Sequence, residues 1–127
     1  MLILTSHIKI INIKDTKKQH LHKPLFTGEV VRQSPVTDNE GSDLSIDYVH
    51  FPKGVRNKLH KHSNDQVLIV TNGRGIVATK DQKARVKEGD VVWAPAGEEH
   101  WHGAAIDSEF SHISVTRSHT KLAQVEK

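Results

Sequence analysis

The sequence predicts an all-β domain, either a sandwich or a barrel. Short runs of alternating or β-branched residues recur along the chain, as in residues 44–51 and 66–71. Turn-forming residues separate these runs at intervals of about eight to twelve residues, which is typical of both architectures. Helical periodicity over a long segment is absent from the sequence. Together these three observations favour short strands over helices throughout.

The 127 residues are enough for one domain, and its elements follow in order. Residues 1–26 are predicted to form an N-terminal arm, with an edge strand near residues 7–14 that lies at a dimer interface. Residues 27–117 are predicted to form the barrel. Its strands are expected at 29–32, 44–51, 66–71, 75–79, 84–87, 90–94 and 109–117. Asn72-Gly73 predicts a hairpin turn. Residues 118–127 are a polar C-terminal tail, expected to form a short helix or to fray.

Composition argues against several classes of protein. The chain has no cysteine, which excludes a disulfide scaffold, a zinc finger, an iron–sulfur cluster and a thiol nucleophile. Its formal charge of +3 comes from scattered Lys and Arg residues, so we expect no nucleic-acid partner. Apolar runs stay well short of the ~20 residues of a membrane span, and the first residues lack a secretory pattern. We therefore expect a cytoplasmic protein with no membrane partner.

Ten histidines are the most informative feature of the composition. His60 and His62 are two positions apart, so on a strand both side chains leave the same face, about 6–7 Å apart. His100 and His102 repeat this spacing 40 residues later. Histidine is the commonest protein ligand for metals, and buried imidazoles without partners are unfavourable. His60, His62 and His100 therefore predict a metal site.

Two further histidines are candidates for chemistry. His112 lies in a strand-like run at 110–115 and could act as a general base, or it could only fill space in the barrel. His102 shares a face with His100 but lies too far along to be an obvious ligand. It could bind substrate or orient a ligand, or lie exposed at the barrel mouth. Trp93, Trp101 and Phe110 are predicted to be core residues.

Two spaced motifs carry a resemblance to a known family. Gly54, five residues, His60-Lys61-His62, three residues, Gln66, six residues and Gly73 resemble the first motif of the cupin superfamily. Gly89, five residues, Pro95-Ala96-Gly97, two residues and His100 resemble the second. The resemblance implies a double-stranded β-helix with one divalent metal near one mouth, held by His60, His62, Gln66 and His100. Gln66 stands where Glu is common, and Ala104 replaces the closing Asn.

A narrower resemblance concerns residues 67–75, 89–93 and 98–105. They are similar to small cupins associated with carboxymuconolactone decarboxylase, among them manganese-dependent hydroxynitrile lyases. This resemblance implies Mn as the metal, with Fe, Ni, Co or Zn as alternatives, and His112 as the base. It also implies a small-molecule substrate, a homodimer or homotetramer, and a carboxymuconolactone-decarboxylase-like protein as a further partner. Ser63-Asn64-Asp65 replaces a Pro- and Gly-containing stretch, so the substrate stays open.

The ligand set suggests the kind of chemistry. Three neutral imidazoles and one amide leave a divalent ion its full +2 charge, which favours Lewis-acid action on an oxygen atom. We therefore expect a small metalloenzyme that acts on a small oxygenated substrate, with His112 or His102 moving a proton. Cleavage or formation of a carbon–carbon bond, as in hydroxynitrile lyases, is its concrete version. The alternatives are an Fe or Mn dioxygenase of the quercetinase-like type and a non-enzymatic ligand- or metal-binding sensor.

Overall fold

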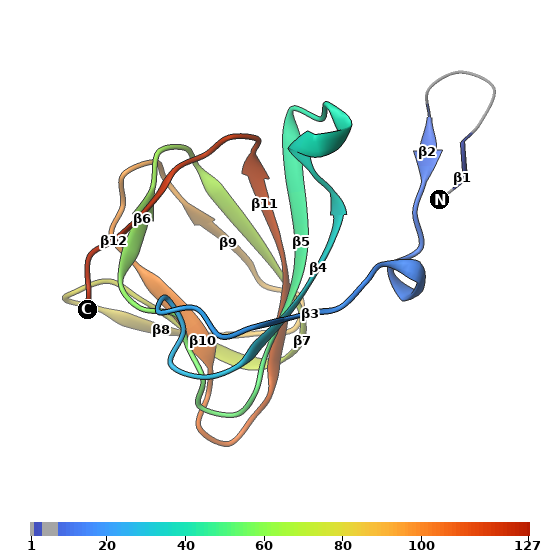
Figure 1. The fold of residues 1–127 in the computed structure, drawn as a ribbon. Coiled ribbons are helices and arrows are strands. Elements are labelled where there is room, and N and C mark those ends of the chain that lie inside the picture. The colour runs from blue at the N-terminus through green and yellow to red at the C-terminus, as the bar shows by residue number, and fades with distance from the viewer. Residues whose placement is uncertain (1, 4–7) are drawn as a thin grey trace.

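The computed structural model describes residues 2–3 and 8–127, and their regular structure is almost all strand (Figure 1). Short 3₁₀ turns, η1 (Ile13–Asp15) and η2 (Asp38–Glu40), are the exceptions. The strands are β1 (Leu2–Ile3), β2 (Lys9–Ile10), β3 (Gln19–Leu21), β4 (Val30–Val36), β5 (Leu44–Phe51), β6 (His60–His62), β7 (Gln66–Ala78), β8 (Lys83–Lys87), β9 (Val91–Ala94), β10 (Trp101–Ala104), β11 (Phe110–Arg117) and β12 (Leu122–Gln124). The all-β prediction is confirmed.

The strands curl into a barrel whose main sheet has the order β10-β7-β11-β5-β4-β3. Strands β8 and β9 also pair with β7, and all of these pairings are antiparallel. Inward and outward residues alternate along β11, where Phe110, His112 and Ser114 are buried. Because side chains on a strand alternate between its faces, this register points His112 and Ser114 into the barrel.

The predicted hairpin at Asn72-Gly73 is wrong. Strand β7 runs without reversal from Gln66 to Ala78, and a β-bulge at Ser111/His112 shifts its pairing with β11. Gly73 has a positive φ of 72°, and a Cβ there would overlap the carbonyl oxygen of Glu109. A glycine that looks like a turn signal thus marks a close approach of backbones inside one long strand, a recognised use of glycine in strands.

The two terminal segments both contribute strands. Residues 9–10 of the arm pair with β1, and Gln19–Leu21 joins the main sheet beside β4. His7, within the predicted edge strand, lies outside the described residues. The prediction that the tail frays or forms a helix is wrong. Leu122–Gln124 forms strand β12, which pairs with β6. A pairing between segments so far apart in sequence leaves no local periodicity from which to predict it.

The apolar core is one cluster of buried side chains inside the barrel. Phe51, Phe110 and Val30 are fully buried there, with Val70 beside them. Phe110 is thus a core residue, as predicted, but Trp93 is 67% exposed, so its core assignment is wrong. Trp93 points outward from β9 and donates from Nε1 to the Asp65 carboxylate at 3.0 Å. Among the described residues, none forms a helix long and apolar enough to span a membrane.

Candidate metal centre

Strand β6 and the residue directly before β10 bring three of the predicted ligands together. His60 and His62 are buried on one face of β6 while Lys61 between them is exposed, as the period of two requires. His100 forms a β-bridge with His60, and their backbone amides and carbonyls exchange two hydrogen bonds of 2.9 Å. The ligand nitrogens of His60, His62 and His100 all lie within 4.8 Å of one another. They form a cluster that could hold a metal ion.

Backbone carbonyls fix two of these imidazole rings. The Nδ1 of His60 donates to the Lys58 carbonyl at 2.6 Å, and the Nδ1 of His100 donates to the Glu98 carbonyl at 2.8 Å. A carbonyl can only accept, so Nδ1 carries the proton in both rings and Nε2 keeps its lone pair. Metal-ligating histidines are oriented by the same kind of hydrogen bond.

Gln66, at the start of β7, completes the cluster. Its Nε2 donates to the Ser114 hydroxyl at 3.0 Å, which turns its Oε1 toward the Nε2 of His100 at 3.1 Å. In a His100 ring whose single proton is on Nδ1, both facing atoms have lone pairs and neither has a hydrogen. Two acceptors at this distance repel each other unless a cation lies near both. Two lone pairs that face each other in this way are typical of groups that bind one metal ion together.

The charge state of the cluster suits a metal as well. Both ring nitrogens of His62 are buried and have no hydrogen-bond partner in the described residues. Burial, with smaller effects from the neighbouring histidines, lowers the pKa of His60 to about 4, and burial also lowers that of His62 to about 4. Near neutral pH both rings are therefore uncharged, which is the form that binds metals. Three imidazoles and an amide oxygen thus fit a divalent ion.

His102 is held in a different way and lies outside this cluster. The Oδ1 of Asn57 accepts from the His102 backbone amide at 2.8 Å, so the Nδ2 of Asn57 donates to His102 Nε2 at 3.1 Å. The proton of the neutral ring must then be on Nδ1, which is buried and has no partner among the described residues. His102 is only 3% exposed. The expectation of an exposed histidine at the mouth is wrong, and the ring can donate from Nδ1.

His112 projects from β11 beside His102, with a distance of 4.9 Å between the two ring centroids. Its two ring nitrogens are buried and have no partner within the part of the chain described. Burial lowers the pKa of His112 to about 3, so the ring is neutral near pH 7 and one nitrogen can accept a proton. The ring of Phe51 packs against His112 at 5.6 Å and against His102 at 5.8 Å.

These groups, apart from His100, line one cavity of about 130 Å³. At about 30 Å³ per water molecule it has space for about four waters, which suits a molecule of few atoms. Its polar wall contains His60, His62, Gln66, His102, His112, Asn57, Ser114, Arg32 and Asp47. Its apolar wall contains Phe51, Val49, Phe26, Leu21, Leu25 and Leu122. Leu21 and Leu122 come from β3 and β12, so both terminal segments contribute to the cavity.

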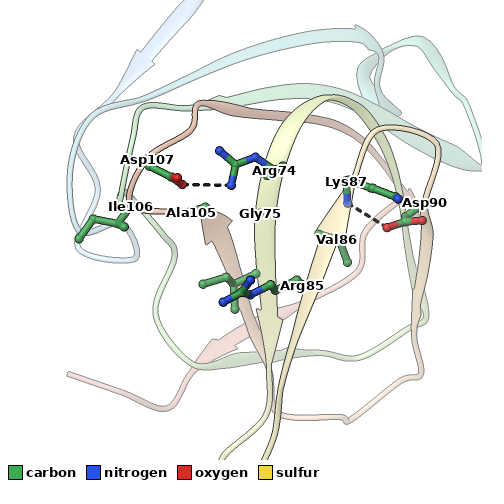
Figure 2. A pocket seen from close by; sticks show the side chains of 10 residues that line it. Arg74, Gly75, Arg85, Val86, Lys87, Asp90, Ala105, Ile106 and Asp107 are labelled. Carbon is green, nitrogen blue, oxygen red and sulfur yellow. Dashed lines mark hydrogen bonds and ion pairs between the residues drawn. The ribbon is translucent and has the colours of Figure 1, made fainter.

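A second hollow, of about 600 Å³, shares no lining residue with this cavity. It lies between β7, β8 and the loop after β10, and Arg74, Arg85 and Lys87 line it (Figure 2). The guanidinium of Arg74 pairs with Asp107 at 3.1 Å, and the Lys87 amide donates to Asp90 at 2.8 Å. None of the histidines described here lines the hollow. The smaller cavity, where the buried nitrogens converge, is therefore the candidate functional site.

Sequence reasoning missed four polar groups of the cavity. Ser114 lies two residues after His112 on the same face of β11, and the period of two could have placed it inside. Asp47 could have been found in the same way, since it lies on the same face of β5 as Val49 and Phe51. Asn57 and Arg32 carry no such local signal, because their positions depend on pairing between distant segments.

Comparison with known proteins agrees with this fold. The family model for the cupin domain matches residues 47–116. The (R)-mandelonitrile lyase of Granulicella tundricola is 40% identical over 68 residues, which are 53% of this chain and 52% of that protein. The chain thus spans about half the length of this curated relative.

Solved structures give the same result over most of the chain. A cupin-like protein from Thermotoga maritima is 31% identical, covers 94% of this chain and 90% of its own, and has a TM-score of 0.79. The polyketide cyclase RemF of Streptomyces resistomycificus, 16% identical over 94% of this chain and 87% of its own, has a TM-score of 0.84 and shows the fold alone. Barrel, motifs and histidine cluster together place this chain in the cupin family.

Proposed function

We propose that this cupin is a small metalloenzyme that acts on a small oxygenated organic substrate. The observation that carries the proposal is the pairing of two kinds of histidine in one cavity. His60, His62 and His100 present nitrogen ligands toward one point. His112 stands apart from them, neutral and without a partner in the described residues. A ligand cluster beside a free proton acceptor is the arrangement that metal-assisted acid–base chemistry needs.

His60, His62, Gln66 and His100 would hold one divalent ion, with Mn proposed from the resemblance to manganese-dependent lyases. An ion bound there would supply a Lewis acid that stabilises negative charge on a substrate oxygen. The Ser114 hydroxyl keeps the Gln66 oxygen directed at the cluster. The carbonyls of Lys58 and Glu98 keep His60 and His100 in the ligating tautomer.

Carbon–carbon bond cleavage in a cyanohydrin is the concrete version of this chemistry. His112 would take the proton of the substrate hydroxyl. The bond between the carbinol carbon and the nitrile carbon breaks, its electron pair leaves with cyanide, and cyanide receives the proton from His112. The products are an aldehyde or ketone and hydrogen cyanide, and the reverse sequence forms the bond. Because burial disfavours the charged ring, His112 would return the proton readily.

His102 would have a different role from His112. With Nε2 engaged by Asn57, it can only donate from Nδ1. It would therefore donate a hydrogen bond to the substrate or to its reacting oxygen, while His112 accepts the proton. Phe51, packed against both rings, holds them at their present spacing and keeps water from that side of the cavity.

Elemental analysis tests the proposal first. Protein purified without a histidine tag should contain close to one divalent metal per chain, and His60→Ala/His100→Ala should lose it. His20→Ala/His22→Ala is the matched control, because both of these histidines are exposed near Glu29. Metal-loaded protein should then cleave small aliphatic cyanohydrins without consuming oxygen. Oxygen uptake would favour a dioxygenase, and failure to bind added Mn or Zn would favour a binding module.

A further inference from the structure

One charged side chain of the cavity has no part in the chemistry proposed above. Arg32 lies on β4 and pairs with Val49 of β5, which in turn pairs with His112 of β11. Residues paired directly across a sheet point to the same face. Arg32, Val49 and His112 therefore form one row across three strands, and all three line the cavity.

The guanidinium of Arg32 is largely free to bind another group. Its Nε donates to the Gln19 side-chain oxygen at 3.0 Å. Among the described residues, no carboxylate lies within ion-pair distance of it. Asp47 is the acidic residue of the cavity wall, and its Oδ1 accepts from the Ser34 hydroxyl at 2.6 Å. An arginine fixed through Nε still offers its two terminal nitrogens as a fork that matches a carboxylate.

The charge of the cavity favours an anion. The ligand set is neutral, so a divalent ion would keep its +2 charge, and the neutral rings of His102 and His112 would add none. Arg32 contributes +1 and Asp47 contributes −1, which leaves the cavity at about +2. A partly enclosed site with this charge attracts anions. Its volume of about 130 Å³ limits the anion to a small one.

We propose that the substrate carries a carboxylate, which the terminal nitrogens of Arg32 bind while a hydroxyl or carbonyl oxygen of the same molecule lies at the histidine cluster. The substrate class is then a short 2-keto acid together with its cyanohydrin, a 2-hydroxy acid that also carries a nitrile. This inference rests on the proposed function and makes it more specific. It assigns Arg32 as a residue that selects substrate, one that the cupin motifs of this chain do not contain.

Calorimetric titration of lactate and its neutral amide, lactamide, tests the assignment. Both probes present a hydroxyl and a carbonyl oxygen, but lactate alone carries the charge. Mn-loaded wild-type protein should bind lactate more tightly than lactamide. In Arg32→Gln we expect lactate affinity to fall about tenfold to hundredfold, with lactamide affinity unchanged. Arg32→Lys should recover part of the loss, since lysine keeps the positive charge but cannot bind a carboxylate through two parallel N–H groups.

Arg85→Gln is the matched control, because it removes one positive charge from the separate hollow and not from the cavity. It should bind lactate as the wild type does. Equal lactate affinity in wild type and Arg32→Gln, or equal affinity for lactate and lactamide, would overturn the inference while leaving the metal site intact.

The same titration on metal-free protein separates the proposed metal-dependent function from the proposed carboxylate site at Arg32. If the wild type takes up no metal, the proposed function fails. Lactate binding to the metal-free protein that is lost in Arg32→Gln would still support the carboxylate site. Absence of lactate binding in both the loaded and the metal-free wild type would overturn it, as would binding that does not depend on Arg32.

Discussion

Acid should destabilise the metal-free protein because of its buried histidines. The ordinary pKa of histidine is about 6.5, and in the fold burial lowers the pKa of His60 and of His62 to about 4. Between these two values the unfolded chain binds more protons than the folded one, so stability falls as the pH falls. The contribution of these uncharged rings to the free energy of unfolding is fully present above about pH 6.5. It is lost progressively as the pH falls toward about 4.

The pKa values give the size of this effect. At about pH 5 a histidine with a pKa of 6.5 unfolded and about 4 folded reduces the free energy of unfolding by about 2 kcal/mol. His60 and His62 together give about 4 kcal/mol, and His112, whose pKa burial lowers to about 3, acts in the same direction. The free energy of unfolding of a domain is roughly 5–15 kcal/mol. Acidification to about pH 5 should therefore remove a large part of it.

Urea unfolding followed by circular dichroism measures this loss, with a chelator present and the pH stepped from about 7.5 to about 5. We expect the urea midpoint to fall steeply below about pH 6.5. His62→Leu should show a pH dependence smaller by about 2 kcal/mol at about pH 5, because it removes one titrating ring. Bound metal should move the fall to lower pH, since protons and metal compete for the same nitrogens. A midpoint that stays constant between the two pH values would refute the reasoning.

Four further predictions concern single features. His112→Ala should lower cyanohydrin turnover by about 10²–10⁴-fold with unchanged metal content by elemental analysis; full turnover would remove its role as base. Gly73→Ala should lower the urea midpoint more than Gly89→Ala, because both have positive φ but only Gly73 meets a backbone carbonyl. Deletion of residues 118–127 should weaken metal binding, measured by chelator competition, by about tenfold or more, since β12 no longer supports β6; equal affinity would exclude that support. Deletion of residues 1–12, which leaves β3 in place and removes the exposed Ile8 and Ile10, should turn a homodimer into a monomer on a sizing column; unchanged elution would contradict the predicted interface.

The spacing of the histidines was sufficient to predict their convergence. His60 and His62 share a face of a strand through the period of two alone, and the cupin resemblance implied His100 as a further ligand. The structure places His100 opposite His60 through a β-bridge. The strand at residues 44–51 was predicted with the bounds observed for β5. These features depend on local alternation, which a sequence displays directly.

The features that could not be predicted depend on contacts between distant segments. Asn57 sets the tautomer of His102 across 45 residues, and the carboxylate of Glu126 reaches Arg56 across 70. The same holds for Asn72-Gly73, whose turn signal is overridden because β7 pairs with β11 up to Gly73 and with β8 from Arg74 onward. Local propensity is a weak guide where tertiary pairing decides the backbone path.

The long strand β7 has a consequence for how the molecule opens. Its first half pairs with β9 and its second half with β8 and β10, while β11 runs beside it from Gln66 to Gly73. Gln66 of the histidine cavity and Arg74 of the outer hollow thus lie on one continuous strand. We expect backbone amides in both halves to exchange with solvent at similar rates, because one uninterrupted strand carries the pairings of both halves. Opening of the metal centre and of the opposite end of the barrel would then be one cooperative event.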